Sequence, residues 1–129
     1  MENRFEVQVR SFDQGLILDM AGDLTKEAEE LLLGLRDWEK GLDGKRYLVF
    51  NFTKVPYINS TGIAILIRIA RAGPKGSFHS FAYGISPHFQ KLFRMIGLTE
   101  YLMIYPDEYS ILQRIQDLAD NVHNLDTNF

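Results

Sequence analysis

The segment Asn59-Ser60-Thr61-Gly62 joins a predicted strand to an unusually apolar predicted helix. Its hydroxyls therefore lie where the first backbone N–H groups of a helix are unpaired and the potential is positive. The fold would tolerate a phosphate of about −1.5 to −2 charge on such a hydroxyl. Ser60 is thus a candidate for modification that would change the surface without unfolding the chain.

Ser60 also has a purely structural interpretation, because serine is among the best residues for capping the N-terminus of a helix. Its hydroxyl would then accept a hydrogen bond from a backbone N–H group of the first turn. In both interpretations the helix begins at Asn59 or Ser60.

The sequence lacks the motifs typical of nucleotide hydrolysis, nucleophilic catalysis or metal binding. The sequence contains no glycine-rich loop of the type that cradles phosphates and no G-x-S-x-G turn that would expose a serine nucleophile. Its three histidines, at positions 79, 88 and 123, are too far apart for a local metal-ligand motif. We therefore expect no enzymatic activity, no metal site and no cofactor.

Composition limits the partners. A chain of 129 residues with 46% hydrophobic residues fits one globular domain. Fourteen basic against seventeen acidic residues give a net charge of −3, which disfavours nucleic acid. The absence of cysteine fits a reducing compartment, and no segment is apolar enough to cross a membrane. We expect a cytoplasmic protein with no membrane association.

The first half of the chain predicts a hairpin, a helix and a central strand. Residues 4–10 and 16–20 alternate between apolar and polar side chains and predict antiparallel strands. A helical stripe should follow, and the unbroken apolar run 47–52 indicates a strand buried on both faces. The residues expected on that stripe are Leu24, Ala28, Leu31, Leu35 and Trp38.

The helix after Ser60 should bury one face of four apolar residues: Ile63, Leu66, Ile67 and Ala70. Its other side carries Ala64 and Arg68, with Ile65 and Ile69 beside them, and could pack closely against a partner. Alternatively, neighbouring helices of the same chain cover the two isoleucines.

The second half predicts a strand over 77–83, a helix opened by Ser86-Pro87 and ended by Gly97, and a short strand at 102–105. The apolar stripe of that helix comprises Phe89, Leu92, Phe93 and Ile96. A last helix begins near Asp107 or Glu108, and residues 120–129 should fray. The fold class is α/β: a single domain over 1–118, a mixed sheet with an N-terminal antiparallel hairpin and about four packed helices, followed by a polar tail over 119–129.

Several motifs in this order resemble the STAS domain of the bacterial anti-sigma factor antagonists. They are Gly22-Asp23-Leu24, the strand 47–52, Val55-x-x-Ile58-Asn59-Ser60-Thr61-Gly62-Ile63 and Phe89-x-x-Leu92-Phe93-x-x-x-Gly97-Leu98. The resemblance extends over residues 4–118.

The resemblance implies a non-catalytic partner-switching protein that binds a serine kinase anti-sigma factor. The kinase would phosphorylate the antagonist on Ser60, with Thr61 as the fallback acceptor, and a serine phosphatase would reverse the step. The expected partner-binding residues are Asp23, Asn59, Ser60, Thr61, Gly62, Ala64 and Arg68. Asp23 has an equally weighted interpretation as the cap of the helix that follows it. A homodimer through the edge strands of the hairpin is a further expected association.

Asn59 departs from the family pattern, which usually has aspartate immediately before the acceptor serine. Asparagine can still cap the helix, but the charge beside the acceptor changes by one unit. The alternative function is therefore a STAS scaffold that is not phosphorylated, or a sensor of a small ligand such as a nucleotide or lipid.

Overall fold

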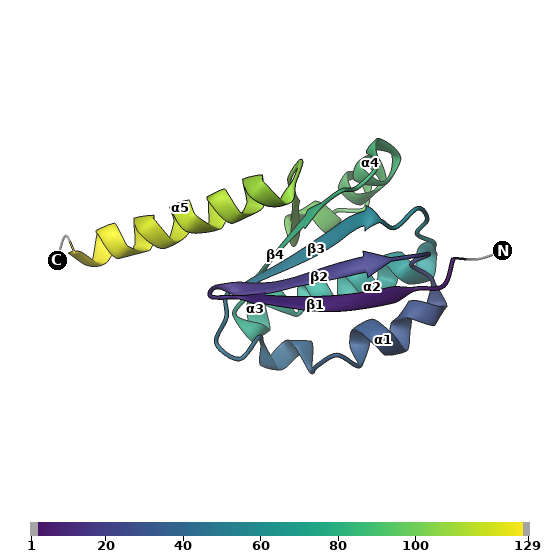
Figure 1. The fold of residues 1–129 in the computed structure, drawn as a ribbon, viewed down its shortest axis with the longest axis horizontal. Helices are drawn as coiled ribbons and strands as arrows, with labels where there is room; N and C mark the ends of the chain where they lie inside the picture. The colour runs from purple at the N-terminus through teal and green to yellow at the C-terminus, as the bar shows by residue number, and fades with distance from the viewer. Residues whose placement is uncertain (1–2, 128–129) are drawn as a thin grey trace.

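The computed structural model describes residues 3–127 and contains one five-stranded sheet (Figure 1). Its strands lie in the order β1-β2-β3-β4-β5; β1 and β2 pair antiparallel, and the other neighbours pair parallel. The predicted mixed sheet with an antiparallel opening is confirmed. The strands are β1 (Glu6–Phe12), β2 (Gly15–Ala21), β3 (Tyr47–Lys54), β4 (His79–Tyr83) and β5 (Leu102–Ile104).

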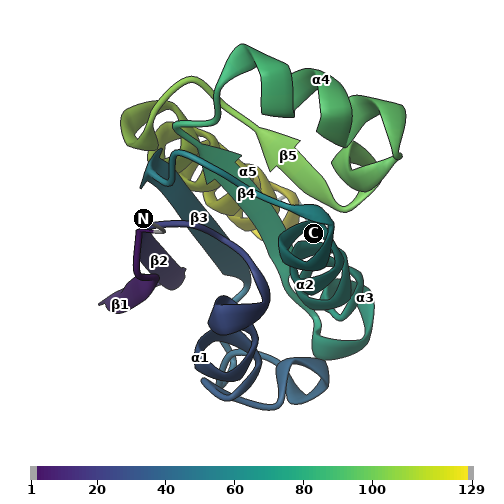
Figure 2. The same ribbon diagram turned by 90° about the vertical axis from the view of Figure 1, so that its right-hand side faces the viewer.

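Helices cover the sheet on both faces (Figure 2). One face, with the larger core, receives α1, α2 and α4 through side chains that include Leu32, Leu66 and Phe93. The other face receives α5 through Ile111 and Ile115. The helices are α1 (Glu29–Leu33), α2 (Ser60–Arg71), the four-residue α3 (Gly73–Gly76), α4 (Pro87–Met95) and α5 (Glu108–Thr127).

β3 is the central strand, as its unbroken apolar run predicts. Leu48 and Phe50 belong to the larger core, whereas Val49 between them belongs to the core under α5. Because successive side chains of a strand point to opposite faces, such a strand must be apolar at every position.

The single helix predicted from Leu24 is wrong. The chain instead forms two 3-10 turns, η1 (Lys26–Ala28) and η2 (Trp38–Lys40), on either side of the five-residue α1. Leu31 and Leu35 are 46% and 38% exposed, and Leu32 is fully buried. The helix ends at Gly34, and the Trp38 indole N–H then donates to the carbonyl of Leu32 at 3.0 Å. This break changes the helical phase, so Leu31 and Leu35 turn outward, whereas the other predicted stripe residues, Leu24, Ala28 and Trp38, are buried in the core.

α4 and α5 begin where their caps predict. Ser86 Oγ accepts from the Phe89 N–H at 3.4 Å, and Pro87 occupies the first helical position. Ile96, expected in the buried stripe, is exposed because it lies at the C-terminal cap of α4. α5 continues to Thr127 through residues expected to fray, and the domain boundary expected at residue 118 lies within this helix and stays a prediction.

Candidate functional site

Asn59, not Ser60, caps α2. Its side-chain oxygen accepts from the Gly62 N–H at 2.9 Å, and its backbone is extended, as at a helix N-cap. Ser60 is the first helical residue and is exposed, and its hydroxyl has no hydrogen-bond partner among the side chains described, those of residues 3–121, or the described backbone. The capping interpretation of Ser60 is therefore wrong. The fallback hydroxyl, Thr61, is half-buried.

A short parallel bridge holds the loop before α2 in place. Leu24 pairs with Ile58: the Leu24 N–H donates to the Tyr57 carbonyl at 2.9 Å, and the Asn59 N–H donates to the Leu24 carbonyl at 3.2 Å. Gly62 is buried against the same carbonyl, since a Cβ at position 62 would lie only 2.0 Å from the Leu24 oxygen. The close approach that requires glycine here thus fixes the start of α2 beside the segment after β2.

Asp23 comes immediately before that bridge and lies beside the N-terminal end of α2. Its carboxylate accepts from the Asn3 backbone N–H at 3.1 Å and from the Asn3 side-chain amide at 3.5 Å. The next turn, η1, begins after Thr25 and has no side-chain cap. The interpretation of Asp23 as a helix cap is therefore wrong. The Asp23 carboxylate instead links Asn3 to the segment that follows β2.

Ser60, Ala64 and Arg68 follow one another at four-residue spacing on the exposed side of α2. Ile65 and Ile69 do not share this surface: both are buried in the core, as in the alternative that neighbouring elements cover them. α2 has no acidic residue in its first turn, so its N-terminal potential is not neutralised by its own side chains. The structure brings together an exposed hydroxyl, a small residue and a cation on one helix face. We call Ser60, Ala64 and Arg68 the switch face; Asp23, whose carboxylate binds Asn3, stays a predicted partner contact.

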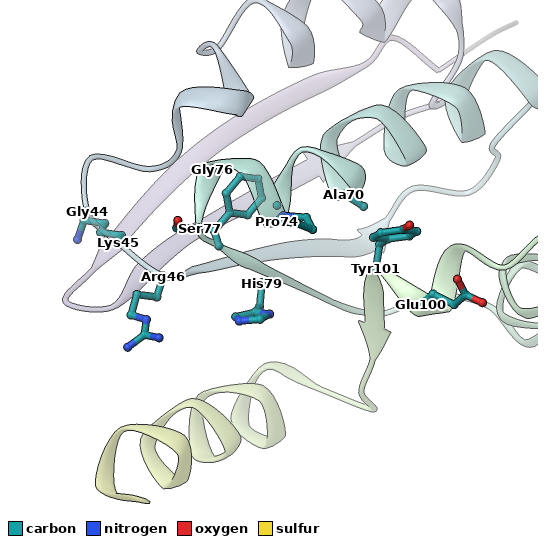
Figure 3. A pocket seen from close by; sticks show the side chains of 12 residues that line it. Gly44, Lys45, Arg46, Ala70, Pro74, Gly76, Ser77, His79, Glu100 and Tyr101 are labelled. Carbon is teal, nitrogen blue, oxygen red and sulfur yellow. The ribbon is translucent and has the colours of Figure 1, made fainter. Parts of the chain in front are cut away.

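A separate cleft of about 760 Å³ lies at the other end of α2 (Figure 3). Arg46 and His79 reach it from the starts of β3 and β4, and Tyr101 closes its far side. No sequence motif predicts this cleft, because its lining comes from three separate segments around residues 44–46, 70–79 and 100–101. Its charged and aromatic lining could hold a small anion with a flat apolar part.

A polar network that the sequence does not reveal fastens α5 to the sheet. Arg10 binds Asp19 and Glu108, each at 2.5 Å, and the Tyr83 hydroxyl donates to Glu108 at 2.9 Å. The Arg10 guanidinium holds the pKa of both carboxyl groups below the usual range, although partial burial opposes it. Burial, with Glu108 beside it, raises the pKa of Tyr83 to about 12. This network links β1, the first strand, to α5, the last helix, and it lies on the sheet face opposite α2.

Among the side chains that the structure describes, those of residues 3–121, no three His, Asp or Glu come together in a way that could hold a metal ion. None of the helices in this part of the chain combines the length and apolar character needed to cross a bilayer.

Residues 6–111 match the family model described as the STAS domain, and the chain belongs to that family. A search of curated proteins finds no match. Among solved structures, a variant of RsbS from Moorella thermoacetica is similar at 16% identity and a TM-score of 0.74, over 88% of this chain and 97% of that one.

Two further structures are similar. Phosphorylated SpoIIAA, described as a Bacillus cell fate determinant, shares 17% identity at a TM-score of 0.68 and covers 85% of this chain and 99% of its own. A sulfate transporter family protein from Wolinella succinogenes shares 16% identity at a TM-score of 0.72, over 86% and 92% of the two chains. At these identities the likeness shows the fold, which is a single STAS domain.

Proposed function

We propose that this protein is a phosphorylation-controlled anti-sigma factor antagonist that exchanges partners without itself catalysing a reaction. The observation that carries the proposal is that Asn59 and Ser60 have different roles at the start of α2. Asn59 caps the helix, so the Ser60 hydroxyl is exposed and uncommitted and can enter the active site of a kinase. A structural neighbour, SpoIIAA, is an anti-sigma factor antagonist solved in both phosphorylated and unphosphorylated forms.

The proposed switch is electrostatic. Unmodified, the switch face would dock a serine kinase anti-sigma factor, and Arg68 would pair with an acidic group of that partner. A phosphate on Ser60 would add negative charge that must be desolvated in the complex and would repel acidic groups of the partner docked beside Ser60. The fold itself would tolerate the phosphate at the positive end of α2, and a serine phosphatase would restore binding.

Asn59 gives this site one negative charge fewer than an aspartate at the same position would. The start of α2 is still capped, because the side-chain amide oxygen of Asn59 accepts the capping hydrogen bond. The proposed partners are a kinase and a phosphatase of the cytoplasm, with a second copy of this chain as a separate association.

Affinity capture from a lysate of the source cells with the wild-type, Ser60→Ala and Ser60→Asp forms tests the switch. We expect the wild type and Ser60→Ala to retain the kinase and Ser60→Asp to lose it, with all three forms equally folded by circular dichroism. Equal capture of the kinase by all three forms would contradict the proposal.

The cleft beside Arg46, His79 and Tyr101 favours one second candidate, a STAS module that senses a small anionic ligand and is not phosphorylated. A nucleotide combines an aromatic ring with phosphates and matches this lining. Isothermal titration with ATP and GTP, using Arg46→Ala as the comparison, separates the candidates: a ligand sensor would lose heat of binding in the variant, whereas the proposed switch needs no such binding.

A further inference from the structure

The outer edge of β1 is unpaired. β1 is the first strand of the sheet and hydrogen-bonds only to β2, and no helix covers its outer side (Figure 2). Within residues 3–127, no hydrogen bond reaches the outward backbone groups of this strand. An uncovered seven-residue strand is a template for another strand.

The hairpin turn determines which residues present those groups. Phe12 pairs with Gly15 across the two-residue turn 13–14. This pair must exchange its own hydrogen bonds, because a non-bonded pair would require a bond between the adjacent residues 13 and 14. Bonding then alternates along β1: Glu6, Gln8, Arg10 and Phe12 bond to β2, while Val7, Val9 and Ser11 turn their N–H and C=O groups outward.

The side chains at this edge complement a second copy of themselves. Val9 is 47% exposed, and Glu6 and Arg10 are exposed on the opposite face of the strand. Arg10 uses Nε and Nη2 for Asp19 and Glu108, and its Nη1 has no partner within the described residues. Glu6 likewise has no ion-pair partner in that part of the chain.

We propose that two copies of this chain associate by antiparallel pairing of β1 with β1, with Gln8 on the two-fold axis. In this register Glu6 lies opposite Arg10 of the second copy, and Val7 lies opposite Val9. Each valine pair exchanges two backbone hydrogen bonds, since both residues turn these groups outward. The result is one continuous ten-stranded sheet, twice the five strands of one chain.

Neighbouring registers fit less well. An axis at Val7 places Arg4 opposite Arg10, which pairs like charges. An axis at Val9 places Glu6 opposite Phe12 and leaves the charges uncompensated. Because exposed ion pairs contribute little, backbone bonding and the valine pairs would supply most of the affinity, and the dimer should be weak and dependent on concentration.

Disulfide trapping tests the register, and the chain's lack of cysteine makes the test clean. A non-bonded antiparallel pair on the axis has Cα atoms about 4.5 Å apart, which is within disulfide range. Gln8→Cys should therefore form a covalent dimer under mild oxidation. Glu6→Cys is the matched control, because its two copies would lie about 14 Å apart along the strands. Absence of a Gln8→Cys dimer, or equal yields from both variants, would overturn the proposal.

Sedimentation velocity of Val9→Pro provides a second test. Proline removes the outward N–H of Val9 and spares the ladder to β2, as at edge strands generally. We expect the wild type to shift toward a dimer as its concentration rises, and Val9→Pro to remain monomeric with an unchanged circular dichroism spectrum. A wild type that is monomeric throughout would refute the dimer. Capture of the kinase by the switch face does not enter either readout, so the two proposals fail separately.

Discussion

The side-chain oxygen of Asn59 accepts a hydrogen bond from the Gly62 N–H at 2.9 Å, and this contact leaves Ser60 free. Both residues are of types that cap helices, and only one of them can occupy the N-cap position of α2. As a result, the hydroxyl one residue further on is exposed at the positive end of the helix, where a phosphate would cost the fold little.

Replacing Asn59 tests whether this residue, and not Ser60, caps α2. Asn59→Ala should destabilise the protein by about 1 kcal/mol, because the Gly62 N–H loses its acceptor. Asn59→Asp should retain most of the stability, since its carboxylate can accept the same bond. Ser60→Ala is the matched control and should change the free energy of unfolding by less than about 0.5 kcal/mol. Urea denaturation measures all three. A larger loss in Ser60→Ala than in Asn59→Ala would show that the cap is misassigned.

Gly62→Ala should be among the most damaging small substitutions in the chain. The new methyl group would sit 2.0 Å from the Leu24 carbonyl oxygen, so α2 or the Leu24–Ile58 bridge must move. We expect a loss of at least about 3 kcal/mol, against about 1 kcal/mol for Ala64→Gly at an exposed position of the same helix. Thermal and urea unfolding compare the two variants, and equal losses would contradict the close approach.

Arg68→Glu should weaken binding of the kinase and leave stability nearly unchanged, because Arg68 is exposed on the switch face. Arg114→Glu on α5 makes the same charge change on an exposed residue of the opposite sheet face. Truncating or reversing a charge in a docked pair typically costs about 2 kcal/mol or more, roughly a thirtyfold loss of affinity. Surface plasmon resonance with the captured kinase measures the affinities. Equal effects of both variants would point to net charge instead of a defined contact.

Acid should loosen α5 through the Arg10 network. The folded-state pKa values of Asp19 and Glu108 are lowered by Arg10, so their contribution is present above the unfolded-state values near 4 and is lost as the pH falls through the folded-state values. Glu108→Gln should therefore be less stable than the wild type at pH 7, with the gap narrowing toward pH 3. Urea midpoints across this range test the expectation. A gap that is constant with pH would contradict it.

Local signals explain why much of the fold is predictable from the sequence. The alternation in the hairpin and the apolar run of β3 predict their strands. Ser86-Pro87 and Gly97 likewise bracket α4, because caps and breakers act over one turn.

Tertiary contacts account for the rest. The bond from the Trp38 indole to the Leu32 carbonyl fixes a broken helix where periodicity indicates a continuous one. Arg10 meets Glu108 across nearly the whole chain, and no spacing rule connects them. At the candidate site, the sequence identifies the segment 59–62 but cannot decide whether Asn59 or Ser60 provides the cap.

Phosphosite mapping tests the central claim most directly. The protein is incubated with ATP and the kinase captured by Ser60→Ala, and the modified residue is then located by mass spectrometry. We predict one phosphate on Ser60 in the wild type, one phosphate on Ser60 in the Thr61→Ala variant, and no phosphate in the Ser60→Ala variant. A wild type that gains no phosphate, or gains it at another residue while Ser60 stays unmodified, would contradict the account.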